Sequence, residues 1–141
     1  LEDKTTKPPI YSSTAWAFVE GNPYFTLEMQ SSKLWNFRLN DLMATNADGS
    51  WKVFTTLSVI GRLYNQDVTD SMVNVVWTRD SGNPTADNKW ALSHANCGLS
   101  VDLTYEDLGG AAFKIGSVTF RCDAEIKDGE TMYSEDVSVS F

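Results

Sequence analysis

His94 and Cys97 come closest to a reactive or metal-binding motif in this chain. His94 is the only histidine in the 141 residues, and two residues separate it from Cys97. A zinc site would combine these two with the second cysteine, Cys122, and one carboxylate. A serine hydrolase would need His94 to be held between an activated serine and a carboxylate. We favour a simpler interpretation, a surface or loop histidine in a short helix without a catalytic role.

The carboxylates occur as two adjacent pairs and as a group in loops. The pairs are Glu106-Asp107 and Glu135-Asp136. Neighbouring residues of a strand point to opposite faces, so neither pair alone supplies the two facing carboxyl groups of a glycosidase. Calcium prefers oxygen ligands of the kind that loop aspartates supply. A calcium site therefore stays open as an alternative to the roles that these aspartates have in turns and at helix caps. The aspartates concerned are Asp67, Asp70, Asp80 and Asp87. We predict no cofactor.

Tryptophan is the best candidate for a contact surface. Five occur in a short chain, and we expect Trp77 to lie in the core. Exposed aromatic rings stack on sugar faces or become buried at subunit contacts. The candidates for ligand or interface contact are Trp90, Trp35 and Trp16, with Trp90 first because it lies in a connection.

Alternating apolar residues predict that strands position these side chains. Strands are expected at 14–20, 24–30, 34–39, 51–64, 72–79, 99–105, 117–126 and 131–141. Residues 85–95 lack alternation and start with a capping-type residue, which predicts one or two helical turns. The sequence Lys-Asp-Gly-Glu at 127–130 predicts a tight hairpin. The fold class is therefore all-β.

A tryptophan strand followed by a hairpin whose first strand carries cysteine is typical of an immunoglobulin-like β-sandwich. We predict such a sandwich at residues 51–141, with residues 1–50 as an N-terminal extension or anchor that is partly β. The extension would add strands to the sandwich edge or dock the module on a partner. The expected core residues are Trp77, Cys122, Phe120, Leu63 and Leu103.

Two features of an antibody domain are missing from the pattern. No cysteine occupies residues 57–65, where the partner of Cys122 would lie, and Leu63 is the expected core neighbour there. Phe120 stands where a tyrosine corner would have tyrosine. A bond between Cys97 and Cys122 is open, but we favour two buried thiols.

Composition narrows the choice of partners. The net charge of −8 and the pI of about 4.4 argue against nucleic acid and anionic membranes, which need a basic face. No apolar run approaches the roughly 18 residues of a membrane span, so no membrane insertion is expected.

Five segments also carry a family resemblance. They are Asp-Val-Thr-Asp at 67–70, Val-Trp-Thr-Arg-Asp-Ser-Gly at 76–82, Ala-Asp-Asn-Lys-Trp at 86–90, Leu-Thr-Tyr-Glu-Asp at 103–107 and Val-Thr-Phe-Arg-Cys at 118–122. Together they resemble the Ig-like modules of tailed-bacteriophage structural proteins, in which V-x-W-T-R, D-x-x-W and T-F-x-C segments recur. The resemblance covers about residues 52–141.

The resemblance implies a non-enzymatic structural or adhesion module of a virion: fibre, tail or capsid decoration. Its partners would be other virion proteins or further copies of itself, a trimer among the options. Such a module would either position other parts of the virion or attach weakly to host or mucosal glycans. The alternative is a bacterial cell-surface or secreted carbohydrate-binding module, which a cluster of exposed tryptophans would favour.

Overall fold

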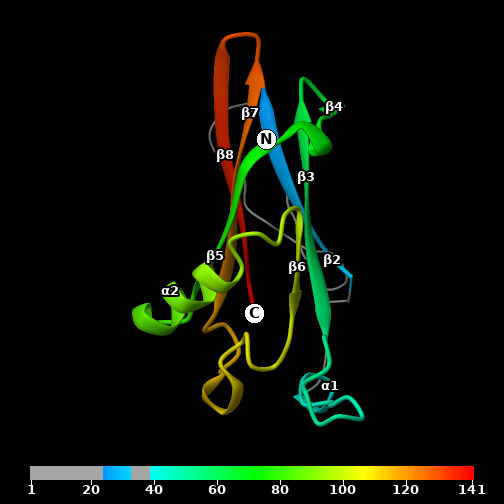
Figure 1. Ribbon diagram of the computed structural model, residues 1–141, viewed down its shortest axis with the longest axis vertical. Coiled ribbons are helices and arrows are strands. Elements are labelled where there is room, and N and C mark those ends of the chain that lie inside the picture. Colours follow the sequence, from blue (N-terminus) through cyan, green and yellow to red (C-terminus); the bar gives the residue numbers. More distant parts are fainter. Residues whose placement is uncertain (1–23, 33–38) are drawn as a thin grey trace, which may run out of the picture.

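The structure, a computed structural model, describes residues 24–32 and 39–141. Strands of two antiparallel sheets account for most of the regular structure (Figure 1). One sheet contains β2 (Phe25–Ser31), β3 (Thr55–Leu63), β4 (Gln66–Asp67) and β6 (Ser100–Leu103), and the other contains β5 (Val73–Asp80), β7 (Thr119–Asp128) and β8 (Thr131–Ser140). The helical segments are α1 (Leu39–Leu42), α2 (Pro84–Ser93), η1 (Thr69–Ser71) and η2 (Gly110–Ala112). The all-β prediction is confirmed, and the two sheets form a sandwich.

The strand order follows from the pairing of two central strands. β3 pairs with β2 on one side and with β6 on the other, while its end forms a short hairpin with β4. β7 lies between β5 and β8. The chain therefore crosses from the first sheet to the second after β4, returns through α2 to β6, and crosses again to β7.

Alternation places one face of each sheet in a shared core. Trp77, Phe120, Cys122 and Leu103 are all at most 2% exposed, in agreement with their predicted core positions. The prediction that Leu63 is a core residue needs correction, because Leu63 is only partly buried at the end of β3, where it packs against the core. The turn after it, where Tyr64 and Asn65 have positive φ, leaves the core. The fully buried apolar side chains of β3 are Leu57 and Val59.

β2 belongs to the sandwich although it precedes residue 50. All seven of its residues pair with β3, from Phe25 opposite Leu63 to Ser31 opposite Leu57. Phe25, Leu27 and Met29 are at most 1% exposed. The chain thus adds an edge strand to the sheet, one of the two roles expected for the N-terminal extension, and residue 50 does not separate this strand from the core. The strand predicted at 14–20, and the part of 34–39 before α1, lie outside the described residues.

The predicted helix is α2, which lies beside β5 toward the lower end of the molecule in Figure 1. It begins after Asn83, whose side-chain oxygen accepts a hydrogen bond from the Ala86 N–H at 3.2 Å, and Pro84 occupies the first turn. Both are favourable helix starts, because the first N–H groups of a helix lack intrahelical acceptors.

Glycine is required at one point of β3. An added Cβ at Gly61 would overlap the thioether of Met72 and press on the ring of Phe25. Gly61 therefore allows the segment before β5 to approach β3 closely, as an isolated glycine within a strand pattern indicates.

Candidate functional site

The side chain of Arg79 holds three segments together at one end of the sandwich. Its Nε lies 2.7 Å from Oδ1 of Asp87 on α2, and its Nη1 donates to the backbone carbonyl of Asp107 at 2.9 Å. Only 8% of the Arg79 side chain and 11% of the Asp87 side chain are exposed. A buried guanidinium needs such partners, because an unpaired charge away from water is costly. The network fixes α2 and residues 104–109 against β5.

Asp87 is ionised in this network. Burial alone raises the pKa of Asp87, but hydrogen bonds from the backbone N–H and hydroxyl of Ser81, with the Arg79 guanidinium, outweigh it and lower the pKa below its usual value. Both oxygens of the carboxylate accept, Oδ1 from Arg79 and the Ser81 hydroxyl and Oδ2 from the Ser81 N–H. Asp87 is thus a structural ion-pair partner.

Trp90 is buried, which corrects its assignment as the first candidate for an exposed contact. Its exposed fraction is 6%, and its indole N–H donates to Oδ1 of Asp107 at 2.8 Å. The ring of His94 stacks on it with centroids 4.0 Å apart, and Phe120 packs at 5.3 Å. The sequence could not show this, because the covering rings come from the end of α2 and from β7. Trp35 and Trp16, the other two candidates, lie outside the described residues.

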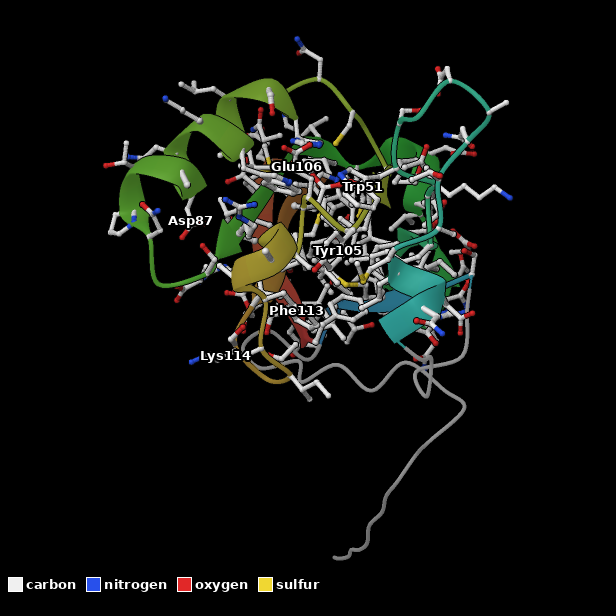
Figure 2. All side chains as sticks on the ribbon, turned by 90° about the horizontal axis from the view of Figure 1, so that it is seen from below. Trp51, Asp87, Tyr105, Glu106, Phe113 and Lys114 are labelled. Atoms are coloured by element: carbon white, nitrogen blue, oxygen red, sulfur yellow. The ribbon has the colours of Figure 1, made fainter. Side chains whose placement is uncertain are left out.

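A groove of about 730 Å³ runs between α2 and residues 104–117. Figure 2 looks onto this end of the molecule, where Asp87 lies on α2, and Phe113 and Lys114 follow η2. The groove is lined by Lys89, Ser93, His94 and Glu106, among others, above the Arg79 network. Asp107 within it is also bound, since its Oδ2 accepts from the N–H and hydroxyl of Thr104.

His94 acts as the C-terminal cap of α2. Its Nδ1 lies 2.7 Å from the carbonyl oxygen of Trp90 and 2.9 Å from the hydroxyl of Ser93. That hydroxyl also donates to the Trp90 carbonyl at 2.8 Å. The contact between serine and histidine therefore belongs to the helix end, where side chains commonly satisfy the last carbonyls.

The two cysteines are unbonded, and the loop aspartates Asp67 and Asp80 bind groups of their own loops. Cys97 and Cys122 are both free thiols, the first half-buried and the second buried. Asp67 accepts from the N–H and hydroxyl of Thr69, and Asp80 accepts from the N–H of Gly82. Within residues 24–32 and 39–141, no group of three or more histidine, cysteine, aspartate or glutamate side chains could hold a metal ion.

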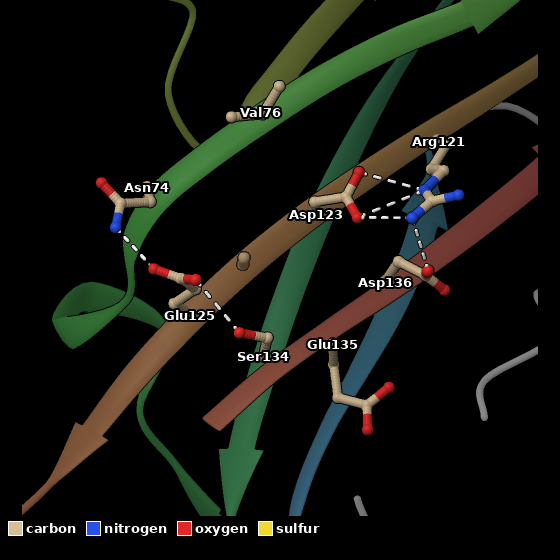
Figure 3. Close-up of a pocket in the computed structure, with 9 residues that line it drawn as sticks. Asn74, Val76, Arg121, Asp123, Glu125, Ser134, Glu135 and Asp136 are labelled. Carbon is tan, nitrogen blue, oxygen red and sulfur yellow. Dashed lines mark hydrogen bonds and ion pairs between the residues drawn. The ribbon is translucent and has the colours of Figure 1, made fainter. Parts of the chain in front are cut away.

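A second, shallow groove of about 680 Å³ lies on the outer face of the β5-β7-β8 sheet (Figure 3). Arg121 lies between two carboxylates there, with Nη2 2.8 Å from Asp123 and 2.8 Å from Asp136. Glu125 accepts from the side chains of Asn74 and Ser134. These bonds link all three strands across the sheet. Glu135 is only 7% exposed, so the predicted Glu135-Asp136 pair is divided between the two faces.

The opposite end of the sandwich carries a cluster of tyrosines that we call the tyrosine cluster: Tyr24, Tyr64 and Tyr133. Ring centroids of Tyr24 and Tyr64 are 5.4 Å apart at 47°, and those of Tyr24 and Tyr133 are 6.2 Å apart at 53°. Tyr24 and Tyr64 are each 52% exposed, while Tyr133 is partly buried. The Tyr64 hydroxyl donates to Oδ2 of Asp128 at 3.1 Å. The cluster thus joins the start of β2, the β3–β4 turn and the β7–β8 hairpin.

Hydrogen bonding also links the phenols. The bond to Tyr133, followed by loss of solvent and the bond to Asp128, raises the pKa of Tyr64. Tyr64 therefore remains a protonated donor throughout the neutral range. Its φ of 51° lies in the left-handed region, which is uncommon for a bulky side chain.

Sequence reasoning missed this cluster because its members lie on three separate elements. One signal was present: Tyr64-Asn65 ends a long strand, and asparagine favours the left-handed turn that a tight hairpin requires. That turn projects Tyr64 beyond the sheet.

Comparison with protein-family models, curated proteins and solved structures finds nothing that matches this chain. Among the helices that the structure describes, none has the length and apolarity to cross a membrane.

Proposed function

We propose that this chain is a non-enzymatic Ig-like module of a bacteriophage virion, acting in assembly or in weak attachment to the host surface. The observation that carries the Ig-like part is the strand order. Ig constant-type domains have strands A, B, E and D in one sheet and C, F and G in the other. The orders β2-β3-β6 and β5-β7-β8 support the proposal, because they match A-B-E and C-F-G. The connection between β5 and β6 forms α2 in place of strand D.

The phage part of the proposal rests on the motif residues and on how they meet. Arg79 of the V-x-W-T-R segment pairs with Asp87 of the D-x-x-W segment. Trp90, the last residue of that segment, bonds to Asp107 and packs on Phe120 of the T-F-x-C segment. Segments far apart in the sequence thus form one bonded unit. Such a unit supports the interpretation of the motifs as a fold signature shared with phage modules.

The same contacts support a non-enzymatic role. Arg79, Asp87, Asp107 and Trp90 bind one another, and His94 caps a helix. These side chains stabilise the packing of α2 on the sandwich. A structural assignment accounts for each of them without a substrate.

The alternative is a bacterial surface or secreted carbohydrate-binding module, for which Trp90 was the first expected contact residue. A stacking platform needs an exposed ring face. Of the tryptophans that the structure describes, Trp90 is covered by His94 and Phe120, Trp77 is buried, and Trp51 packs against Tyr105 with ring centroids 4.9 Å apart. Trp16 and Trp35 lie outside the described residues. We therefore place the virion module first.

Mass spectrometry of density-banded particles tests the proposal. Cultures of the bacterium that carries the gene would be lysed, and particle, membrane and soluble fractions would be compared for peptides of this chain. Enrichment in the particle band with capsid proteins is the expected result. Peptides confined to the membrane or soluble fractions would contradict the virion assignment.

A further inference from the structure

The tyrosine cluster has the composition and spacing of a site for an organic cation. A cation is attracted to the face of an aromatic ring within about 6 Å of the ring centroid. Centroids 5.4 and 6.2 Å apart lie close enough for one cation to contact two or three of the rings at once. Half of the surface of Tyr24 and of Tyr64 is open to solvent.

A carboxylate is part of the cluster. Asp128 accepts one hydrogen bond from Tyr64, and a carboxylate has about four acceptor positions in all. Asp128 pairs with Thr131 across the hairpin, so it lies at the tip of the β7–β8 ladder, next to the turn that contains Glu130. Asp128 thus places negative charge beside the rings.

Among the residues that the structure describes, the basic side chains next to the cluster in sequence, Lys127 and Arg62, are directed elsewhere. Lys127 is exposed and alternates with the buried Ile126, so it projects from the outer face of its sheet, away from Tyr133. Arg62 forms an ion pair with Glu28, with Nη1 and Oε1 2.8 Å apart. The chain as a whole carries −8. Charge therefore favours a cationic ligand at this end.

The phenol hydroxyls are less suited to a neutral sugar. The Tyr64 hydroxyl already donates its proton to Asp128, so it is not available to donate to a sugar. A sugar would need such a donor for its own hydroxyls. A quaternary, trimethylated ammonium group makes no such demand, because it has no strong hydrogen-bond donors or acceptors and binds through charge and ring faces.

We propose that the tyrosine cluster, with Asp128, binds a methylated ammonium group, the chemistry shared by choline headgroups and trimethylated lysine. Tyr24 and Tyr64 supply the open ring faces, Tyr133 closes the side toward β8, and Asp128 supplies the opposite charge. The inference does not depend on the place of the module in a virion.

The test is a titration of the full chain, labelled with ¹⁵N, by choline chloride at constant ionic strength. The matched ligand is 3,3-dimethylbutan-1-ol, which has the shape of choline without its charge. We expect choline to shift the amide signals around residues 64, 128 and 133, and to bind at least about tenfold more tightly than the alcohol. Equal binding of the two ligands, or no shift with choline, would overturn the proposal.

Two variants and one control locate the site. Tyr64→Asn removes a ring while keeping a residue that tolerates the left-handed turn, and Asp128→Asn removes only the charge. Each is expected to weaken choline binding at least about fivefold. Met132→Ala, an exposed position of the same hairpin, should leave it within about twofold. If Tyr64→Asn fails to fold, choline binding by the Asp128→Asn variant tests the site on its own. Unchanged choline binding by a folded Asp128→Asn variant would overturn the proposal.

Further ligands identify the source of the ammonium group. Tighter binding of phosphocholine than of choline would support a headgroup, and tighter binding of a peptide with trimethylated lysine would support a protein. N-acetylglucosamine and cellobiose are run in parallel. Shifts of the same amides by a sugar, with none by choline, would replace the proposal with a glycan site.

Discussion

Trp77 lies directly opposite Cys122 in the ladder between β5 and β7. Both side chains point into the core, where their exposed fractions are 2% and 0%. The indole N–H of Trp77 donates to the backbone carbonyl of Gly98 at 2.8 Å. The tryptophan of the central pair thus binds the connection between α2 and β6, and it couples the β5-β7-β8 sheet to the segment that returns to the other sheet.

Trp77→Phe should lower the free energy of unfolding by about 2 kcal/mol, because it removes one hydrogen bond and part of a large buried ring. Urea denaturation followed by circular dichroism measures this. Val76→Thr changes an exposed neighbour on the same strand and should stay within about 0.5 kcal/mol of the parent. A loss at Trp77 no larger than that of the control would show that the indole bond to Gly98 contributes nothing.

The two thiols should differ sharply in reactivity. Burial, with smaller contributions from Asp123 and Cys97, raises the pKa of Cys122 to about 12, and burial also raises the pKa of Cys97. The thiolate is the reactive species, so both cysteines react slowly near neutral pH. Cys122 is buried and should react only after the protein unfolds. A thiol reagent at pH 8 should modify Cys97 first in the native protein and both in denaturant. Rapid modification of Cys122 without unfolding would contradict its burial.

Asp87→Asn should cost about 3 kcal/mol at pH 7, because Arg79 is left without its charged partner in a buried position. The folded-state pKa of Asp87 is depressed, so its contribution is complete above the unfolded value near 4 and is lost as pH falls through the folded value. The difference in unfolding free energy between parent and variant should therefore shrink below about pH 4.

The exposed pair of Arg62 and Glu28 provides the control for that experiment. Its side chains are 42% and 51% exposed. Glu28→Gln should change the unfolding free energy by at most about 1 kcal/mol, since exposed ion pairs contribute little. A cost as large as that of Asp87→Asn would remove the distinction between buried and exposed pairs.

Gly61→Ala should destabilise the protein by about 1–3 kcal/mol, because the added methyl group overlaps Met72 and crowds Phe25. Met72→Ala removes the overlap between the Met72 thioether and the added methyl group, but it also removes the packing of the methionine side chain. A double-mutant cycle measures the coupling, and the pair should be less destabilising than the sum of the single changes. Strict additivity would show that Met72 is not the residue that requires glycine at position 61.

The strands were predictable where alternation is strong. β7, β8 and β5 appear within a few residues of their expected positions. Buried and more exposed residues alternate along much of β7 and β8, whereas Trp77 is the buried residue of β5. The core positions of Trp77 and Cys122 followed from the same alternation. The helix at 84–93 was predictable from its capping residue and from the loss of alternation.

The sites were less predictable, because they depend on contacts between distant segments. Trp90 was expected to be exposed, since nothing local shows that His94 and Phe120 cover it. Leu63 was expected in the core, but the strand turns out of the sandwich at Tyr64. The tyrosine cluster combines the residue before β2, a turn and β8, and it depends both on the pairing of β2 with β3 and on the contact of β2 with β8.

Immunogold electron microscopy tests the central claim most directly. Antibodies raised against the folded chain would be applied to intact phage particles from a culture in which the gene is present, and to the bacterial cells of that culture. Gold particles at a regular position on the head, tail or fibres are the result that the proposed virion role predicts. Label on the cell surface, with unlabelled phage particles in the same field, would contradict it and favour the bacterial surface module.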